Sequence, residues 1–266
     1  MERTKYWNEE YTKYWKNLTQ EANDKEDDKT KVKKLKDGDY KTIGQDTAYL
    51  LFDEMAYKKD EILLDYGCGF GRFYSYFNSR AHYYGIDISE SMISECKKSY
   101  PNAQDRFIVS EGENLPFDKN YFDKIICFGV FDACYQENAL QEMLRVTAEG
   151  GIILLTGKNY NYNIDDEQAY IAEEAARKKG HPNYFTDVAS LIKQIKGSAS
   201  IELERYFLYR GDFGKNKYVT DMPAKFYEFA IIIKKIRDDK VELKKFSDEY
   251  SLTWREKNSA DIGENN

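Results

Sequence analysis

Three glycines at alternate positions follow an aspartate and form the stretch of the chain best suited to bind a ligand. The apolar run that begins at Ile62 ends at Asp65. Gly67, Gly69 and Gly71 then stand at every second position. Glycine lets the backbone turn sharply and approach a ligand closely. The pattern therefore predicts a strand, a tight turn and the start of a helix, which together form the first unit of a nucleotide-type site.

The residues around this turn indicate which nucleotide binds there. A dinucleotide-binding turn has a third glycine where Arg72 stands, and it presents backbone N–H groups to a pyrophosphate. The carboxylate of Asp65 would disfavour bound phosphates and would suit a ligand with a cationic amino group and no phosphate. S-adenosylmethionine (SAM) is such a ligand. We predict that Asp65, Gly67, Gly69 and Arg72 bind it; a glycine-rich turn with a hairpin or capping role is the alternative.

A second acidic residue stands where a ribose would be recognised. Asp87 ends the next predicted strand, about twenty residues after Gly67, and an acid at that distance can accept hydrogen bonds from both ribose hydroxyls. Ile88 would flank the adenine. Capping of the helix expected over 90–99 is the alternative role for Asp87, although Ser89 can fill it as well.

Four segments resemble one enzyme family in order and spacing. The order D-x-G-x-G-x-G resembles motif I of the class I SAM-dependent methyltransferases. Residues 110–117 (S-E-G-E-N-L-P-F) are similar to the family's G-D-A-E-N-L-P-F, residues 120–131 to its S-F-D-x-V segment, and residues 145–151 to its R-V-L-K-P-G-G segment. The resemblance covers residues 62–157 and implies a methyltransferase of the small-molecule type that uses SAM as cofactor.

The resemblance adds three cofactor-binding residues to the prediction. Glu111 stands where the family usually has aspartate, and its carboxylate can accept a hydrogen bond from the adenine amine. The N–H of Gly112 can donate to a ring nitrogen. Phe128 is expected at the carboxyl end of the central strand, where the methionine part of the cofactor would pass. A solvated acid in a loop is the alternative interpretation of Glu111.

Two residues are predicted to act in catalysis. A substrate hydroxyl needs a proton acceptor, whereas a carboxylate or phosphate oxygen is already anionic. His181 is the candidate base because its ordinary pKa suits that task; a surface histidine in a loop is the alternative. Asp132 is the second candidate and stands near a position where many relatives have histidine. Facing the substrate and capping the helix at 136–146 are both open to Asp132.

The predicted substrate-binding residues come from three separate segments. Tyr14 belongs to a helix expected over 5–16, whose aromatic residues share one face and either dock on the body or cap the pocket. Tyr184 lies in the insertion at about 158–186, where similar methyltransferases place lids. Arg210 follows the sixth predicted strand and could meet an anionic substrate, with a solvated charged loop as the alternative.

The order of elements predicts an α/β fold. We expect a doubly wound, mostly parallel seven-stranded sheet with helices on both faces and an antiparallel last strand. Residues 1–41 are predicted to form an N-terminal helix and connection, 42–235 the SAM-binding domain, and 236–266 a charged helix followed by a disordered tail. The strands are predicted near residues 62–66, 83–86, 106–109, 120–131, 152–156, 201–207 and 226–233.

Composition excludes several classes of protein. A net charge of −7 and a pI of about 5.2 argue against a protein held to nucleic acid by phosphate neutralisation. No apolar run approaches the ~18 residues of a membrane-spanning helix. The N-terminus lacks an apolar signal core. The 4 cysteines form no C-x-x-C pair, so we expect no metal site and a cytoplasmic location.

The leading functional hypothesis is transfer of a methyl group to a small polar acceptor. An oxygen of a sugar or phosphorylated metabolite is favoured, and surface-polysaccharide modification is one setting for it. The predicted partner is this small-molecule acceptor, without nucleic acid or membrane, and the oligomeric state is open. An N-methyltransferase acting on a macromolecule is one alternative, although its N/D-P-P-Y/F signature is missing. A non-catalytic SAM-binding module and a NAD-dependent oxidoreductase are the others.

Overall fold

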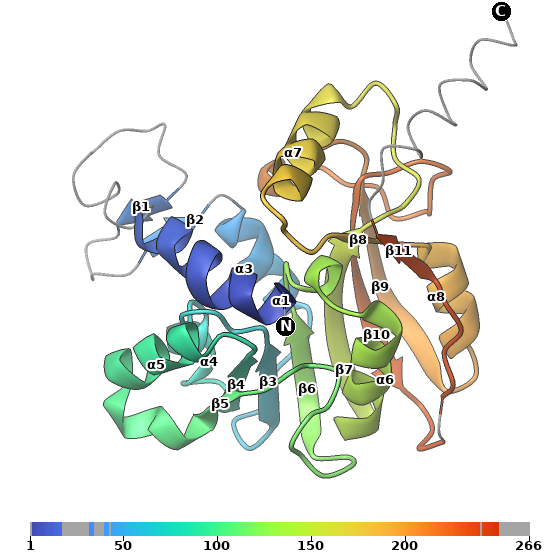
Figure 1. Cartoon of the computed structure of the whole chain (residues 1–266). Helices are drawn as coiled ribbons and strands as arrows, with labels where there is room; N and C mark the ends of the chain where they lie inside the picture. The colour runs from blue at the N-terminus through green and yellow to red at the C-terminus, as the bar shows by residue number, and fades with distance from the viewer. Residues whose placement is uncertain (1, 18–31, 35–39, 43, 240, 250–266) are drawn as a thin grey trace, which may run out of the picture.

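A seven-stranded sheet runs through the centre of the computed structural model (Figure 1). The structure describes residues 2–17, 32–34, 40–42, 44–239 and 241–249. The strands of the central sheet are β3 (Ile62–Tyr66), β4 (His82–Asp87), β5 (Phe107–Val109), β6 (Phe122–Cys127), β7 (Thr147–Lys158), β9 (Ala199–Phe207) and β10 (Glu228–Lys235).

The order of these strands across the sheet is β5-β4-β3-β6-β7-β10-β9. Each pair from β5 to β7 is parallel, whereas β10 runs antiparallel to both β7 and β9. The predicted fold class, including the antiparallel last strand, is therefore confirmed. The parallel strands all end at one edge of the sheet, and in open α/β sheets that edge is where ligands bind.

Helices cover both faces of the sheet because successive strand residues point to opposite sides. In β6, Ile125 and Cys127 pack in the cluster that includes α6 (Gln136–Val146) and α8 (Val188–Ile195). Ile126 points the other way, into the cluster on the opposite face. The helices on that opposite face are α3 (Gln45–Asp53), α4 (Tyr74–Phe77) and α5 (Glu90–Ser99).

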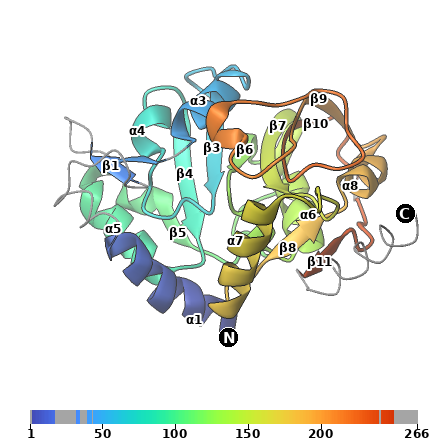
Figure 2. The same cartoon turned by 90° about the horizontal axis from the view of Figure 1, so that it is seen from above.

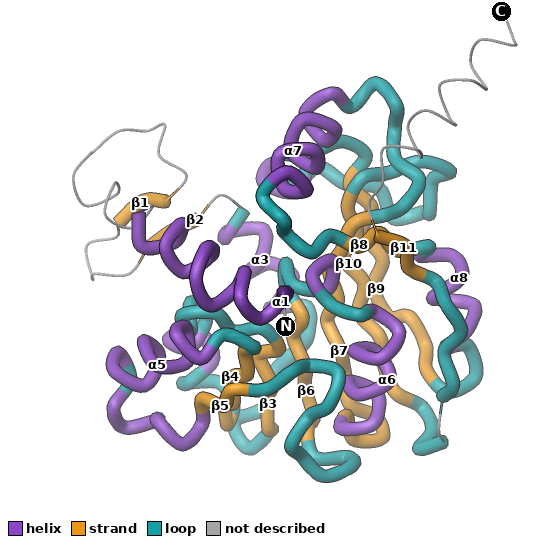
Figure 3. Tube along the Cα trace, in the orientation of Figure 1, coloured by secondary structure: helices purple, strands orange, loops and turns teal. Residues whose placement is uncertain are grey.

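Two helical segments lie above the carboxyl ends of the parallel strands. The first comprises α1 (Glu2–Lys5), the π-helix η1 (Tyr6–Tyr11) and a further helical stretch at 12–17; we call it the N-terminal helix. The second is α7 (Glu167–Lys178), which is part of the insertion after β7. Figure 2 shows the two side by side, and Figure 3 shows the loop segments that surround α7 at this end of the molecule.

The remaining elements are short. The strands are β1 (Val32–Lys34), β2 (Tyr40–Thr42), β8 (Tyr184–Thr186) and β11 (Ser247–Glu249), and the 3-10 turns are η2 (Pro101–Arg106), η3 (Phe131–Ala133) and η4 (Phe213–Lys215). Among the described residues, no helix combines the length and apolar character needed to cross a membrane.

The described part of the C-terminal segment differs from the predicted charged helix. Strand β11 pairs antiparallel with β8 at 247–249. Tertiary contacts account for the difference: Phe246 is buried and stacks on Phe131, and Glu137 accepts hydrogen bonds from the backbone N–H groups of Phe246 and Ser247. The rest of the predicted helix and tail, 250–266, lies outside the described residues.

Candidate functional site

A cavity of about 340 Å³ opens at the edge where the parallel strands end. One end, which we call the loop end, is lined by the glycine turn after β3, the end of β4 and the loop after β5. The other, the charged end, is lined by η3, the last residue of β7, α7 and the loop after α7. The N-terminal helix covers the space between them with Trp7, Tyr11 and Trp15.

The glycine turn has the backbone conformation that the sequence pattern requires. Gly67 has a φ of 76°, and a Cβ there would lie 2.6 Å from the side chain of Val130. Gly69 has a φ of 55°, and its nearest neighbour on the Cβ side is Met92, 3.9 Å away. The turn is fixed to the adjacent strand because the N–H groups of Gly67 and Cys68 both donate to the carbonyl of Ile86. Gly67 is therefore required for packing against Val130, whereas the backbone at Gly69 faces the cavity beside open space.

Asp87 presents its carboxylate to the loop end. One oxygen accepts the N–H of Gly69 at 2.9 Å and the other accepts the N–H of Ser89 at 2.8 Å. The hydroxyl of Ser89, not Asp87, caps α5 by accepting the N–H of Met92. These bonds fix the orientation of the carboxylate, and each oxygen keeps lone-pair capacity for a ligand. Ile88 also lines the cavity, and its contact with the adenine stays a prediction.

Asp65 lies beneath the turn and outside the cavity lining, which differs from the predicted direct contact. Its side chain is 2% exposed and accepts a hydrogen bond from the hydroxyl of Tyr83 at 2.8 Å. Asp65 stands two residues after Leu63 in β3, so the two side chains point to the same face of the sheet. That face is covered by α4 and α5, and the side chain of Asp65 therefore points away from the cavity. Burial raises the pKa of Asp65 to about 7.

Arg72 lines the cavity from the other side of the turn. Its guanidinium lies 4.3 Å from the ring centre of Phe73 and 5.8 Å from that of Phe128. Burial lowers the pKa of Arg72, and the charges of Tyr11 and Asp65 oppose that shift. Arg72 and Phe128 thus both line the cavity, and their contacts with a cofactor stay predictions.

The loop after β5 reaches the cavity through different residues than expected. Gly112 lines it, whereas Glu111 is exposed and lies outside the lining. Glu113 lines it instead and accepts the N–H of Tyr135 at 2.9 Å. Gly112 is required by packing, because a Cβ there would lie 1.7 Å from the hydroxyl of Tyr66. That hydroxyl is buried.

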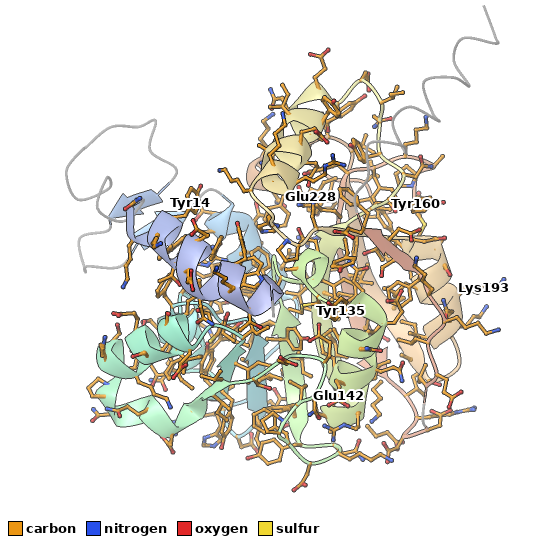
Figure 4. The ribbon with its side chains drawn as sticks, in the orientation of Figure 1. Tyr14, Tyr135, Glu142, Tyr160, Lys193 and Glu228 are labelled. Carbon is orange, nitrogen blue, oxygen red and sulfur yellow. The ribbon has the colours of Figure 1, made fainter. Side chains whose placement is uncertain are left out.

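The N-terminal helix both docks on the body and covers the cavity. Asn8 accepts hydrogen bonds from the hydroxyl of Ser89 and the N–H of Ser91. Tyr14, the predicted contact, is 40% exposed on the outer side of the helix, where its ring meets the ammonium group of Lys179 (Figure 4). A π-helix has more residues per turn than an α-helix, so residues four apart lie on one face. Trp7, Tyr11 and Trp15 therefore face the cavity, whereas Tyr14 points away from it.

The charged end is built around Lys158, the last residue of β7. Its Nζ lies 2.8 Å from Oδ2 of Asp132 and 3.1 Å from Oε1 of Glu173. It also donates to Oδ1 of Asn183 at 3.2 Å. Asp132 therefore pairs with Lys158 and does not cap α6, whose N-cap residue is Tyr135. Burial acts to raise the pKa of Asp132, but the charge and hydrogen bond of Lys158, together with the charge of His181, lower it overall.

Glu173 ties the insertion to the sheet. Its side chain is 1% exposed and accepts hydrogen bonds from Asn183 and from the hydroxyl of Tyr227. Arg210, a predicted substrate residue, lines the cavity and donates to the same Tyr227 hydroxyl at 2.9 Å. Tyr184 does not reach the cavity; it contacts Tyr135 and lines a separate groove beside β11.

His181 lines the cavity between the N-terminal helix and the charged end. Its ring centre lies 5.0 Å from that of Trp7 and 5.2 Å from that of Tyr6, both edge-on. Its Nδ1 is buried and, within the described ranges of the chain, has no hydrogen-bond partner. Burial lowers the pKa of His181, while the negative charge of Asp132 opposes the shift. A neutral imidazole with a free nitrogen can accept a proton.

Comparison with known proteins assigns the domain that carries the loop end. Residues 64–155 match a family model described as a methyltransferase domain. This segment is a class I SAM-dependent methyltransferase domain. The predicted family and the predicted SAM cofactor are confirmed at that level.

The curated relatives match only part of the chain. An uncharacterised protein of Methanocaldococcus jannaschii is 31% identical over 118 residues, which are 44% of this chain and 50% of the relative. A ubiquinone/menaquinone biosynthesis C-methyltransferase of Campylobacter jejuni is 30% identical over 107 residues, 37% of this chain and 45% of the relative. The chain thus spans about half or less of the length of these relatives.

Solved structures show the same fold at low sequence identity. The YcgJ protein of Bacillus subtilis is 15% identical, with a TM-score of 0.54 over 73% of this chain and 100% of its own. Geranyl diphosphate C-methyltransferase of Streptomyces coelicolor is 12% identical, with a TM-score of 0.57 over 72% of this chain and 78% of its own. At these identities the likeness concerns the fold alone.

The loop end of the methyltransferase domain fits SAM on its own geometry. The turn leaves open space beside Gly69, and Asp87 offers fixed carboxylate oxygens. Sequence reasoning missed Lys158, Glu173 and Glu113 as lining residues. The position of Lys158 at the carboxyl end of a strand was a usable signal, whereas Glu173 reaches the cavity only through the docking of α7.

Proposed function

We propose that the chain transfers a methyl group from SAM to a hydroxyl oxygen of a small polar acceptor, a class that includes sugars and phosphorylated metabolites. One observation carries this proposal: a single cavity joins the loop end of the methyltransferase domain to a charged end in which the Nδ1 of His181 has no partner among the described residues. The loop end suits a nucleoside, and the charged end suits an acceptor that forms hydrogen bonds.

The loop end would hold the cofactor through contacts of different kinds. Asp87 would accept hydrogen bonds from the ribose hydroxyls, Ile88 and Gly112 would border the adenine, and Arg72 would attract the carboxylate of the methionine part. When bound, SAM supplies a methyl group on a cationic sulfur, which an acceptor oxygen can attack in line. The protein contributes orientation and electrostatics to that reaction.

His181 would take the proton of the acceptor hydroxyl. Its lowered pKa keeps the imidazole neutral near pH 7, so Nδ1 is available as an acceptor. Protonation would create an imidazolium close to the charge of Asp132, which favours the protonated form. Asp132 itself is a weaker base because Lys158 holds its pKa low. We therefore assign proton acceptance to His181 and acceptor binding to Asp132.

The charged end also favours a polar acceptor over the quinones for which some relatives are named. Those proteins match this chain only in part, and Lys158, Asp132 and Glu173 give the cavity of this chain a polar acceptor side. The cover formed by the N-terminal helix and α7 favours a small molecule over a macromolecular acceptor.

Detection of the demethylated cofactor tests the proposal. The purified chain is incubated with SAM and a panel of sugars, sugar phosphates, amines and quinols, and S-adenosylhomocysteine (SAH) is measured by mass spectrometry. We expect acceptor-dependent SAH with a hydroxylated compound, and the NMR shift of the new methyl group should identify an O-methyl product. A protein that binds SAM but forms SAH with none of these acceptors would favour a non-catalytic SAM-binding module.

A further inference from the structure

The imidazole of His181 depends on ring contacts for its orientation. The backbone N–H of His181 donates to the carbonyl of Ala176 in α7 at 3.1 Å, which holds the main chain. The buried Nδ1 has no hydrogen-bond partner in the part of the chain that the structure describes. A general base must lie within hydrogen-bond reach of the proton that it takes, so the groups that pack against the ring decide where Nδ1 points.

Two aromatic residues of the N-terminal helix supply this packing. Trp7 and Tyr6 meet the imidazole edge-on, with ring centres 5.0 Å and 5.2 Å from that of His181. Trp7 is itself held between Tyr6 and Tyr11, whose ring centres lie 5.0 Å and 4.7 Å from its own in T-shaped contacts. Edge-to-face pairs at these distances are favourable. The contact joins the N-terminal helix to the loop after α7, and Figure 2 shows this helix and α7 side by side.

The N-terminal helix acts on His181 by excluding water. The charges that act on the pKa of His181 belong to Asp132 of η3, Lys158 of β7 and Glu173 of α7. Burial raises the pKa of Tyr6 to about 12, so Tyr6 stays neutral where His181 titrates. Burial is also the largest cause of the lowered pKa of His181, and the rings of the N-terminal helix provide one side of that burial.

Hydrogen bonds at Asn8 fix the position of Trp7 relative to the loop after β4. The side chain of Asn8 accepts the hydroxyl of Ser89 at 3.1 Å and the N–H of Ser91 at 3.3 Å. Its backbone carbonyl accepts the hydroxyl of Ser91 at 3.3 Å. The N–H of Ser89 donates in turn to Asp87 at 2.8 Å. The Trp7 ring is therefore connected through a short run of hydrogen bonds to the carboxylate that we propose for the ribose.

We propose that Trp7 is a positioning residue for methyl transfer: its ring orients His181 as the base, and the docking of Asn8 holds that ring at a fixed place above the loop after β4. The inference rests on the proposed function for the role of His181. It goes beyond that function by assigning a part in catalysis to the N-terminal helix, which precedes the methyltransferase domain at residues 64–155.

Histidine NMR tests the inference without any acceptor. The chain contains 2 histidines, and His82 is exposed at the start of β4, so its signal serves as the internal reference. In Trp7→Ala water reaches the imidazole, so the midpoint of the His181 titration should move up by about 0.5 pH units or more. Trp7→Phe keeps an aromatic ring and should stay close to the wild type. Equal midpoints in the wild type and Trp7→Ala would overturn the inference, as would equal midpoints in Trp7→Ala and Trp7→Phe.

Two further variants locate the effect on the N-terminal helix. Tyr14→Ala is the matched control, because it removes an aromatic ring from the outer side of the same helix and should leave the His181 titration unchanged. Asn8→Ala removes the side-chain docking bonds, so it should move the midpoint in the same direction as Trp7→Ala, and it carries the test if Trp7→Ala does not fold. A shift in Tyr14→Ala as large as in Trp7→Ala, or no shift in Asn8→Ala, would contradict the inference.

Turnover provides the second arm. His181 accepts a proton in its neutral form, which predominates above its pKa, so the acidic limb of kcat against pH should move to higher pH in Trp7→Ala by the same amount as the NMR midpoint. Trp7→Phe should restore the wild-type profile. A limb that stays in place while the NMR midpoint moves would refute the positioning role and leave the proposed methyl transfer intact. If no acceptor is methylated, the proposed function fails, and the NMR titrations still decide whether Trp7 holds His181.

Discussion

The loop end and the charged end of the cavity are built in different ways. The loop end comes mainly from short segments that follow β3, β4 and β5, and backbone groups at Gly67, Gly69 and Gly112 form much of it. The charged end joins side chains from η3, β7 and α7, and each depends on its partners for its position. The difference teaches that the methyltransferase domain builds the loop end locally, whereas the charged end, the proposed acceptor site, depends on how the insertion docks.

Removal of Glu173 should have the largest effect and tests whether the charged end holds the insertion in place. Glu173→Ala removes one buried partner from each of Lys158, Asn183 and the hydroxyl of Tyr227. We expect a loss of about 3 kcal/mol in the free energy of unfolding, measured by urea denaturation. Exposed Lys193→Ala is the control and should change it by less than about 0.5 kcal/mol. Equal stability of the two variants would show that α7 docks without this network.

His181→Ala should separate catalysis from cofactor binding. A lost general base typically lowers turnover by about 100-fold or more. The affinity for SAM should stay unchanged because the cofactor contacts lie at the loop end. The measurements are kcat with a methylated acceptor and the Kd for SAM by calorimetry. A variant with wild-type turnover would dismiss His181 as the base.

Asp87→Ala tests the loop end in the same way. The loss of two hydrogen bonds to a charged group should weaken SAM binding by about 2–3 kcal/mol. Asp60→Ala, at an exposed turn before β3, is the matched control and should bind SAM like the wild type. Unchanged affinity in Asp87→Ala would contradict the ribose assignment.

The pH dependence of turnover should reflect the buried environment of His181. Burial lowers its pKa below the ordinary value of 6.5, and the neutral form that accepts a proton predominates above the pKa. The acidic limb of kcat against pH should therefore have its midpoint below 6.5 and fall about ten-fold for each further pH unit. A midpoint above 6.5 would mean that the charge of Asp132 outweighs burial.

The smallest effect distinguishes two neighbouring acids. Glu111 is exposed outside the cavity, so Glu111→Ala should change the free energy of SAM binding by less than about 0.5 kcal/mol. Glu113→Ala should weaken it more, because Glu113 lines the cavity and fixes the N–H of Tyr135. Calorimetry on both variants measures the difference. A stronger effect at Glu111 would support the contact between Glu111 and the adenine that the sequence predicted.

The sheet and the glycine turn could be predicted because their signals are local. Apolar runs indicate strands, and the positive φ angles at Gly67 and Gly69 require the residue type that the motif supplies. Asp87 could be placed by its spacing from Gly67. The prediction that Asp65 faces the cavity was wrong. The orientation of its side chain is set by the face of β3 on which it stands and by the hydrogen bond from the hydroxyl of Tyr83.

The charged end could be predicted only in part because its contacts join distant residues. His181, Asp132 and Arg210 were predicted and do line the cavity. Their partners Lys158 and Glu173 were not, since no spacing in the sequence relates a strand end to the middle of α7. Tyr14 was selected on α-helical spacing, which the π-helix at 6–11 alters.

Direct titration of the purified chain with SAM tests the central claim that the turn after β3 binds this nucleoside. Isothermal calorimetry with SAM and, separately, with NAD should give saturable one-site binding for SAM and none for NAD. Saturable binding of NAD together with no binding of SAM would contradict the account.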